Sequence, residues 1–491
     1  MLTPTNNDLP RATPESQGIT SSAILKFVEA VESQIHELHS FMLLRHGKVV
    51  AEGWWSPYGR EYPHLLFSLS KSFTSTAIGL AVSEGILSLD DQVISFFPDE
   101  APTEPNEHLA AMRIRHLLTM STGQANDTWL NMVGRADGNW VKGFFELPVL
   151  SPPGNNFIYN NGASYLLSAI IQKVTGMKLV DYLQPRLFEP LGITGATWKE
   201  SPQGIAGGGI GLSLKTEDVA RFGQMYLDKG MWQGKRILSE AWITEATETR
   251  IANAGIEVDW SQGYGYQFWR SRHNGYRGDG VFGQWCIIMP EQDAVMAITA
   301  GIDLFDSQLP LNLVWDILLP AMGQDALPDN AAAFETLSTK LSNLTMLPVQ
   351  GDSTSPMMEK ISGQTYAVDT NELKLEAITL SFTDSDCEVR FKTAAGEETL
   401  PCGYGSWQRG ETTLFSQPLL FNRIPSPVAV SGAWTADDTF TMIFRLYETP
   451  FFHTVVCNFA DDELMIESQI NVSLESTKPQ LLMARSVALI T

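Results

Sequence analysis

Apolar and polar residues alternate with two different periods in the first two thirds of the chain. Two apolar runs, 40–45 and 49–54, flank a short polar turn, which predicts a β-hairpin that turns on Gly47. After residue 68 the apolar period changes to that of a helix, which we expect to end near Gly85. The apolar positions of this helix are Phe73, Ala77, Leu80 and Ala81.

The same patterns predict further elements up to residue 320. Helices are expected where apolar residues recur at three or four positions, and strands where short apolar runs are bounded by turn residues. Thr216 is the expected N-cap of one helix. The expected helices are 114–120, 159–174 and 311–319, and the expected strands are 285–289 and 294–299.

The pattern changes after about residue 322. An amphipathic helix is expected within 329–346, and the stretch 348–356 has the composition of a linker. Short alternating segments follow at fairly regular spacing, which predicts an antiparallel sheet or a small barrel. These segments are 375–382, 388–392, 440–446, 454–459 and 464–470.

The length of 491 residues exceeds what one hydrophobic core usually supports, so two or more domains are expected. The changes of pattern divide the chain into a mixed α and β domain, a helix with a linker, and an all-β domain. We place these parts at residues 1–325, 326–356 and 357–491. The first part belongs to the α/β class in the broad sense, which includes α+β folds.

The net charge of −23, from 33 basic and 56 acidic residues, narrows the function classes. Nucleic acids and anionic membranes attract clustered positive charge, so neither is expected as a partner. No apolar run of 18 residues occurs, and the first 18 residues lack the apolar core of a secretory signal.

Four cysteines are present without a CxxC pair, so no metal site is predicted and a cytoplasmic location is expected. A bridge between Cys387 and Cys402 stays open at this point.

Ser68 and Lys71 form the only Ser-x-x-Lys pattern in the chain, and it lies where the apolar helix begins. Residues three apart share a helix face, so the lysine amine can reach the serine hydroxyl. A serine next to a group that takes its proton is the minimum equipment for acyl-enzyme formation. The alternative reading is a capping serine followed by a solvated lysine.

Two later motifs add polar groups of the same kind. Tyr159 and Asn161 form the only Tyr-x-Asn pattern, after a Pro-Gly turn, and the alternative is a loop tyrosine with an asparagine cap. Gly278, Asp279 and Gly280 lead into the strand at 285–289, where glycines let a substrate backbone lie against a strand edge. By itself this third motif is equally typical of a glycine hairpin.

Together, the order and spacing of the three motifs resemble those of the serine β-lactamase and penicillin-binding-protein superfamily. The most similar branch holds class C β-lactamases, D-Ala-D-Ala carboxypeptidases, family VIII esterases and 6-aminohexanoate-dimer hydrolases. The flanking segments 84–91 and 114–123 agree with it, and the resemblance covers about residues 15–320.

The resemblance implies an antiparallel sheet flanked by helices, a helical lobe, and a C-terminal barrel of the lipocalin-like kind found in some D-amino-acid peptidases. It also implies catalysis without a cofactor or a metal. Ser68 would be the nucleophile, and Lys71 and Tyr159 the proton-transfer pair, with the identity of the base left open. Asn161 would bind Lys71 and the substrate amide. The backbone N–H groups of Ser68 and Val281 would form the oxyanion hole.

The third motif departs from the β-lactamase pattern. Gly278 stands where β-lactamases carry a cation for the substrate carboxylate, and Asp279 stands where Thr or Ser is usual. Efficient β-lactamase activity is therefore not expected, and an uncharged ester, an amide, or a peptide with an amino group fits better. The rival hypothesis is a penicillin-fold binding or sensor protein with little turnover. A homo-oligomer stays open.

Overall fold

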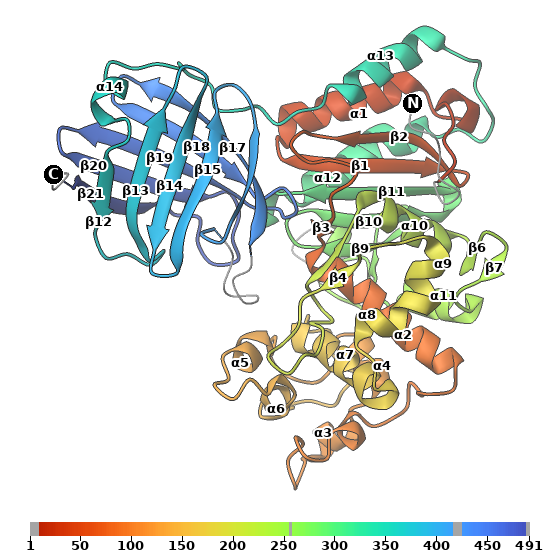
Figure 1. The fold of residues 1–491 in the computed structure, drawn as a ribbon. Coiled ribbons are helices and arrows are strands. Elements are labelled where there is room, and N and C mark those ends of the chain that lie inside the picture. Colours follow the sequence, from red (N-terminus) through yellow and green to blue (C-terminus); the bar gives the residue numbers. More distant parts are fainter. Residues whose placement is uncertain (1–8, 255–257, 416–424, 488–491) are drawn as a thin grey trace. The chain divides into compact units, whose positions relative to one another are not determined.

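The computed structural model describes residues 9–254, 258–415 and 425–487, and the chain divides into two compact units (Figure 1). The fold class predicted from the sequence is confirmed: the first unit mixes helices with an antiparallel sheet, and the second is a β-barrel. The first unit takes in Met1–Trp54, Pro63–Ala300 and Leu304–Asn343, and the second takes in Trp55–Tyr62, Gly301–Asp303 and Leu344–Thr491.

A six-stranded antiparallel sheet forms the centre of the first unit. The predicted hairpin on Gly47 is its first element, and both turn residues, His46 and Gly47, have the positive φ of a type I′ turn (49° and 70°). In spatial order the strands are β2 (Lys48–Trp54), β1 (Leu38–Arg45), β11 (Ala294–Ala300), β10 (Gln284–Met289), β9 (Tyr276–Gly280) and β8 (Trp269–Arg270).

Both faces of this sheet are covered. Every residue of β1 is buried, which requires packing partners on two sides because successive side chains point to opposite faces. Phe41 packs edge-to-face on Phe27 of α1 (Ser21–Gln34), with ring centroids 5.8 Å apart. Its neighbour Ser40 makes a hydrogen bond of 2.6 Å with Thr216, the first residue of α10 (Thr216–Leu227). Helices α1 and α10 therefore lie on opposite faces.

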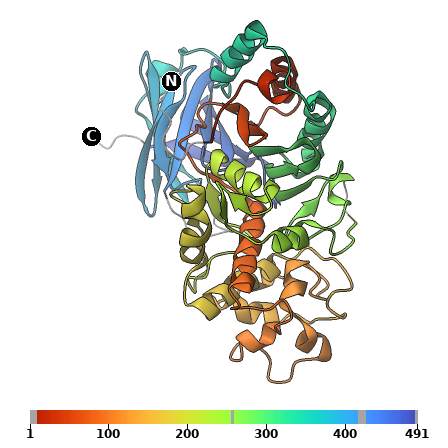
Figure 2. The same cartoon turned by 90° about the vertical axis from the view of Figure 1, so that its right-hand side faces the viewer.

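Helices α3 to α7 build a lobe beyond the sheet, and α2 runs into this lobe (Figure 2), whereas α12 and α13 pack on α1. Contacts of α2 and α4 with α7 hold the lobe together. Shorter strands, β3 (His64–Leu65), β5 (Leu212–Leu214) and β4 (Thr197–Trp198), form a small sheet of their own, and β6 (Met231–Trp232) pairs with β7 (Lys235–Arg236). The helices are α2 (Ser70–Ser83), α3 (Glu107–Ala111), α4 (Ile114–Leu118), α5 (Trp129–Val133), α6 (Trp140–Phe145), α7 (Asn161–Thr175), α8 (Leu179–Leu183), α9 (Glu189–Leu191), α11 (Glu240–Thr247), α12 (Gln308–Leu313) and α13 (Ala331–Ser342).

Three predicted helix starts shift by one or two residues, each for a local reason. Ser68 lies in a 3₁₀ turn, η2 (Phe67–Leu69), which precedes α2. Helix α7 starts at Asn161 because the side chain of Asn160 accepts hydrogen bonds from the N–H groups of the first turn. Thr216 was expected as an N-cap, but Lys215 takes that position and the Thr216 hydroxyl bonds Ser40 instead.

Two glycines of β9 allow this strand to lie directly against η2 and α2. A Cβ atom at Gly278 would lie 2.3 Å from Leu69 Cδ1, and one at Gly280 would lie 2.2 Å from the carbonyl oxygen of Leu66. Neither distance is compatible with a side chain. The glycines of the third motif therefore hold the Ser68 segment and the sheet edge at close range.

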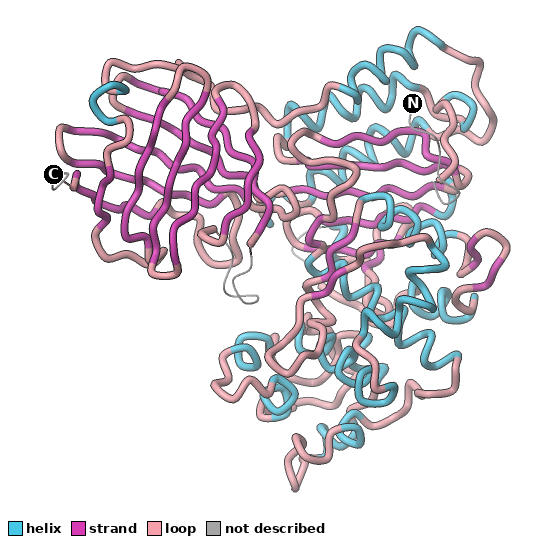
Figure 3. The backbone as a smooth tube through the Cα atoms, viewed as in Figure 1, coloured by secondary structure: helices cyan, strands magenta, loops and turns pink. Residues whose placement is uncertain are grey.

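The second unit is a β-barrel, visible as the strand-rich part of Figure 3. Its ten strands form one sheet, and a parallel pairing of Gly403 in β15 with Ser431 in β17 closes nine of them into a ring. The unit also holds α14 (Met358–Ile361). In spatial order the strands are β15 (Gly396–Gly403), β14 (Asp386–Thr393), β13 (Leu375–Phe382), β12 (Thr365–Val368), β21 (Gln480–Ser486), β20 (Glu463–Ile470), β19 (Phe452–Ala460), β18 (Thr439–Arg445), β17 (Ser426–Ala436) and β16 (Gln408–Thr412).

Alternation of apolar and polar residues explains the barrel. In β14, for example, Cys387, Val389 and Phe391 are buried while the residues between them are more exposed. Each of the five predicted strand segments overlaps an observed strand, and β13 has the predicted limits. Five strands, β12, β15, β16, β17 and β21, lie outside the predicted segments, and the longest of them is β17. Seven consecutive residues in it, 428–434, are buried, so its sequence does not alternate.

The four cysteines are free thiols, all of them buried. Cys387 and Cys402 are direct partners in the register of β14 and β15. Burial raises the pKa of both thiols, which leaves them unreactive as nucleophiles. Within the described parts of the chain, no helix is long and apolar enough to cross a bilayer.

We predict that Gly280→Ala lowers the free energy of unfolding by about 1–3 kcal/mol, since the added methyl group must push β9 away from η2. Chemical denaturation measures this change. Gly323→Ala is the matched control, because a Cβ there meets nothing closer than 3.5 Å. Equal stability of the two variants would contradict the close packing of β9 on η2.

Candidate functional site

The buried amine of Lys71 brings together three segments that lie far apart in the sequence. Its Nζ donates hydrogen bonds to Ser68 Oγ (2.9 Å), Asn161 Oδ1 (2.6 Å) and the carbonyl oxygen of Gly209 (2.8 Å). Lys71 is only 1% exposed, so these three oxygen atoms replace its water shell. The predicted contact between Ser68 and Lys71 is thus present, although Ser68 precedes the α-helix proper.

Burial also sets the protonation of this amine. Removal from water lowers the pKa of Lys71 from 10.5 to about 7, against the opposing effect of the carboxylates of Asp127 and Asp279. Near neutral pH a substantial fraction of the amine is therefore uncharged. An uncharged amine has two N–H bonds and one lone pair, which matches donation to Asn161 and Gly209 and acceptance from the Ser68 hydroxyl.

Tyr159 contacts both Ser68 and Lys71. Burial raises the pKa of Tyr159 well above its usual value, an effect that a hydrogen bond with Ser68 opposes. Its ring lies beneath the Lys71 amine, with Nζ 4.8 Å from the ring centroid, and stacks on Trp269 at 5.7 Å. The phenol thus remains protonated at neutral pH, while the amine of Lys71 is partly uncharged.

Asp127 holds Asn161 in position and was missed by the sequence analysis. Its carboxylate accepts from the backbone N–H of Asn161 (2.8 Å) and from the side-chain Nδ2 (2.6 Å). Because the side-chain Nδ2 of Asn161 is bound to Asp127, the other atom of the amide, Oδ1, faces Lys71. Asp127 lies in an irregular, exposed loop with no pattern around it, so no signal in a single sequence could have identified it.

The glycine cluster at 204–211 supplies the last partner of Lys71. Gly208 has a φ of 63°, and a Cβ atom there would lie 2.4 Å from the Ser164 carbonyl oxygen. A Cβ at Gly209 would lie 3.2 Å from Lys71 Nζ. A run of three glycines in the sequence is a signal of such a close backbone approach.

The third motif is built differently from the expectation. Asp279 accepts a hydrogen bond of 2.8 Å from Arg277 Nε, so its charge is balanced by a guanidinium two residues away on the same strand face. Arg277 is the only cation of β9 and is fully buried. Nothing within the motif indicates this pair, because the opposite charge precedes the motif.

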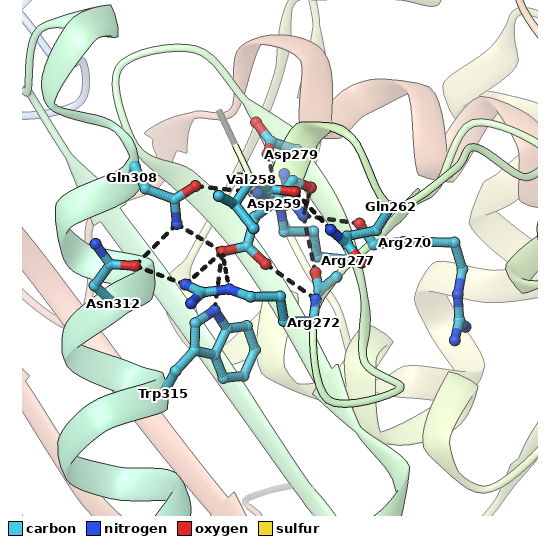
Figure 4. Close-up of polar contacts among 11 residues, drawn as sticks. Val258, Asp259, Gln262, Arg270, Arg272, Arg277, Asp279, Gln308, Asn312 and Trp315 are labelled. Atoms are coloured by element: carbon cyan, nitrogen blue, oxygen red, sulfur yellow. Dashed lines mark hydrogen bonds and ion pairs between the residues drawn. The ribbon is translucent and has the colours of Figure 1, made fainter. Parts of the chain in front are cut away.

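A polar network anchors Arg277 to the rest of the first unit (Figure 4). Its Nη1 donates to the backbone oxygen of Asp259 (3.0 Å) and to the Ser271 hydroxyl (2.8 Å). The carboxylate of Asp259 is itself bound by Arg272, with Nη2 and Oδ2 3.0 Å apart, and by Trp315 Nε1 at 3.1 Å. Asp259 is fully buried, so this network fixes the strand that carries the third motif.

The predicted site residues therefore fall into two groups. Ser68, Lys71, Tyr159 and Asn161 meet in one polar cluster. The residues of the third motif lie beside that cluster and have several roles: Gly278 and Gly280 allow close packing, Asp279 pairs with Arg277, and Val281 begins the turn into β10. Among the described residues, no group of three His, Cys, Asp or Glu side chains could hold a metal ion.

Ser68, half-buried in the η2 turn ahead of α2, is thus bonded to the buried amine of Lys71 and to Tyr159, beside an antiparallel sheet and a helical lobe. The sequence matches the Beta-lactamase family over residues 31–305, which is more than half of the chain. The chain therefore belongs to the beta-lactamase family.

Three individual similarities refine the comparison. The 6-aminohexanoate-dimer hydrolase of Paenarthrobacter ureafaciens is 25% identical over 309 residues, which cover 58% of this chain and 78% of the relative. A lovastatin esterase of Penicillium rubens is 27% identical over 156 residues, or 26% of this chain and 38% of the relative. These relatives are hydrolases, one of them an esterase.

Among solved structures, a provisionally assigned 6-aminohexanoate-dimer hydrolase from Bacillus anthracis superposes with a TM-score of 0.54. It is 21% identical in sequence and covers 66% of this chain and 89% of its own. This similarity establishes the fold of the first unit, and it leaves the chemistry to be argued from the residues of the site.

We predict that the Lys71 amine titrates near pH 7 and that Asp127→Asn moves this titration to lower pH, because the carboxylate stabilises the charged amine. Side-chain ¹⁵N NMR of lysine-labelled protein measures both values, with Lys71→Ala to assign the signal. Asp137→Asn, an exposed carboxylate bound to Arg135, is the matched control. A Lys71 pKa near 10 would contradict the effect of burial.

Proposed function

We propose that this protein is a serine hydrolase that cleaves an ester or amide bond of a small substrate through an acyl-enzyme on Ser68. The observation that carries the proposal is the hydrogen bond between Ser68 Oγ and a lysine amine that burial keeps partly uncharged. An uncharged amine at this distance can take the serine proton, which an ordinary surface lysine cannot do at neutral pH.

In the first step, Ser68 Oγ attacks the carbonyl carbon of the substrate and its proton moves to Lys71 Nζ. The proposal assigns the base to Lys71 because the pKa of Tyr159 is raised and that of Lys71 lowered to about 7. The positive charge formed on Lys71 is stabilised by Asn161 Oδ1 and the Gly209 carbonyl oxygen. These oxygen atoms already accept hydrogen bonds from Lys71, so no side chain has to move when the amine takes the proton.

In the second step, the bond to the leaving group breaks and Tyr159 donates its phenolic proton to that group, while a proton from Lys71 returns to the phenol. A water molecule then attacks the acyl carbon and loses a proton to Lys71 Nζ. The bond between the acyl carbon and Ser68 Oγ breaks, the proton passes from Lys71 to Oγ, and the acid product and free Ser68 result. The backbone N–H groups of Ser68 and Val281 are assigned to the oxyanion, and such a donor is worth about 3 kcal/mol in comparable enzymes.

The charges around the site favour a neutral acyl group. Asp127 and Asp279 both act electrostatically on Lys71, and the one cation of β9, Arg277, is fully buried and paired with Asp279. A substrate carboxylate would meet the exposed carboxylate of Asp127 and no exposed cation on β9, because Arg277 is buried against Asp279. Esters and amides without a carboxylate next to the scissile bond are therefore the proposed substrates, in accord with the esterase and amino-acid-dimer hydrolase among the relatives.

Two further expectations from the sequence belong to this proposal. The catalytic domain is assigned to residues 1–325, the helix and linker to 326–356, and the β domain to 357–491. A cytoplasmic location is supported by four thiols that remain free although Cys387 and Cys402 face each other in register.

We predict that Ser68→Ala lowers kcat for p-nitrophenyl butyrate by a factor on the order of 10⁶, as loss of a comparable nucleophile does. Ser75→Ala is the matched control, because Ser75 lies on the same helix α2, is buried, and has no hydrogen-bond partner for its hydroxyl within the described structure. The control should retain full activity. Activity of Ser68→Ala near that of the wild type would rule out Ser68 as the nucleophile.

We also predict that p-nitrophenyl butyrate is hydrolysed with a kcat/KM at least about tenfold above that of its analogue with a terminal carboxylate. The physical reason is repulsion by Asp127 where β9 exposes no cation, and tenfold corresponds to about 1.4 kcal/mol. Rates are corrected with Ser68→Ala as the blank. A preference for the carboxylate substrate would contradict the assigned substrate class and leave the nucleophile assignment intact.

A further inference from the structure

Two phenylalanines stand directly beside the two backbone groups assigned to the oxyanion hole. Phe67 precedes Ser68, and Phe282 follows Val281. Neither belongs to the three motifs, and the sequence around them gave no reason to select them. Their backbone conformations and their mutual contact set them apart from other buried phenylalanines.

Both residues have a backbone conformation that aromatic residues rarely adopt. The φ angle is 47° at Phe67 and 68° at Phe282, in the left-handed region where the Cβ atom is crowded. Phe282 is the third residue of a turn closed by a hydrogen bond from the Gly283 N–H to the Gly280 carbonyl oxygen (3.3 Å). A positive φ at the third position of such a turn normally requires Gly or Asn. At a phenylalanine, the free-energy cost of this positive φ must be offset by contacts of the side chain.

The compensation is visible in the packing of the two rings. Their centroids are 5.3 Å apart at an interplanar angle of 90°, which is the preferred edge-to-face geometry. Each residue is only 2% exposed. The rings thus join the η2 turn to the β9–β10 turn, while Gly280 brings the backbones of the same two segments together.

We propose that the Phe67–Phe282 pair is a positioning device that holds the two N–H groups of the oxyanion hole at a fixed separation. This inference rests on the proposed function, because it presumes attack by Ser68. Neither ring touches the reacting atoms in this scheme. Each acts through the backbone: Phe67 sets the orientation of the peptide group that carries the Ser68 N–H, and Phe282 fixes the turn that contains Val281.

Such a device affects the transition state more than the bound substrate. The oxygen of the scissile carbonyl gains full negative charge only during attack, so misplaced N–H donors lower kcat and change KM little. A displacement of about 1 Å in a preorganised site costs about 100-fold in rate. Loss of either ring should therefore lower kcat roughly 10- to 100-fold.

The experiment uses Phe67→Leu, Phe282→Leu and the double variant of the full chain, with p-nitrophenyl butyrate as substrate. The matched control is Phe27→Leu, which breaks an edge-to-face pair of the same kind in the same unit but with ordinary backbone conformation. Thermal denaturation reports folding of all four proteins. Phenylboronic acid, whose boron bonds Ser68 Oγ and becomes tetrahedral, reports transition-state affinity apart from turnover.

The expected result has three parts. Each single variant loses kcat roughly 10- to 100-fold with KM within about threefold, and the affinity for phenylboronic acid falls by a similar factor. The double variant is no worse than the poorer single variant, because the rings act as one unit. Phe27→Leu loses stability but keeps kcat.

Two outcomes would overturn the proposal. One is a full kcat in folded Phe282→Leu, and the other is additive losses in the double variant. Either would leave the hydrolase assignment standing, since wild-type activity and its loss in Ser68→Ala test that assignment separately. If the single variants do not fold, Phe282→Gly, which adopts the same φ without strain, gives the same comparison of kcat with KM.

Discussion

The burial of one amine beside one hydroxyl is the constraint on which the site depends. A lysine that is 1% exposed must replace its hydration with fixed oxygen atoms, and Lys71 finds them on Ser68, Asn161 and Gly209. The same burial brings its pKa to about 7. Both the stability of the buried amine and its low pKa therefore require the fold to bring oxygen atoms from three distant segments to the Lys71 amine.

Several neighbouring residues hold these oxygen atoms and the Ser68 turn in position. Asp127 fixes Asn161, the glycine run lets the backbone at Gly209 approach the amine, and Gly278 and Gly280 let β9 lie against the Ser68 turn. The network around Asp259 holds Arg277 in place, and Arg277 in turn holds Asp279, which projects from the same face of β9. These contacts join segments that lie far apart in the sequence, so the site depends on the fold as a whole.

The sequence predicted the elements and motifs well because their signals are local. Hairpin turn residues, helical spacing in α2, and alternation in the barrel strands each depend on neighbours within a few positions. The approach of Ser68 to Lys71 followed from their spacing, and the family resemblance supplied Tyr159 and Asn161. Strand β17 could not be predicted from alternation, because seven consecutive residues in it are buried.

The parts that could not be predicted depend on tertiary contact. Asp127 has no motif, and the pairing of Asp279 with Arg277 becomes apparent only once both side chains project from one strand face. The positive φ at Phe67 and Phe282 goes against local preference, and only the ring contact between distant segments accounts for it. Single-sequence reasoning fails where a residue is chosen for a neighbour far along the chain.

The most direct test of the central claim is peptide-resolved mass spectrometry after exposure to a fluorophosphonate at neutral pH. The account predicts one adduct per chain, on the peptide that contains Ser68, with a rate that rises as Lys71 loses its proton around pH 7. Labelling of another residue, or no adduct at all, would contradict the claim that a buried, uncharged lysine activates this serine.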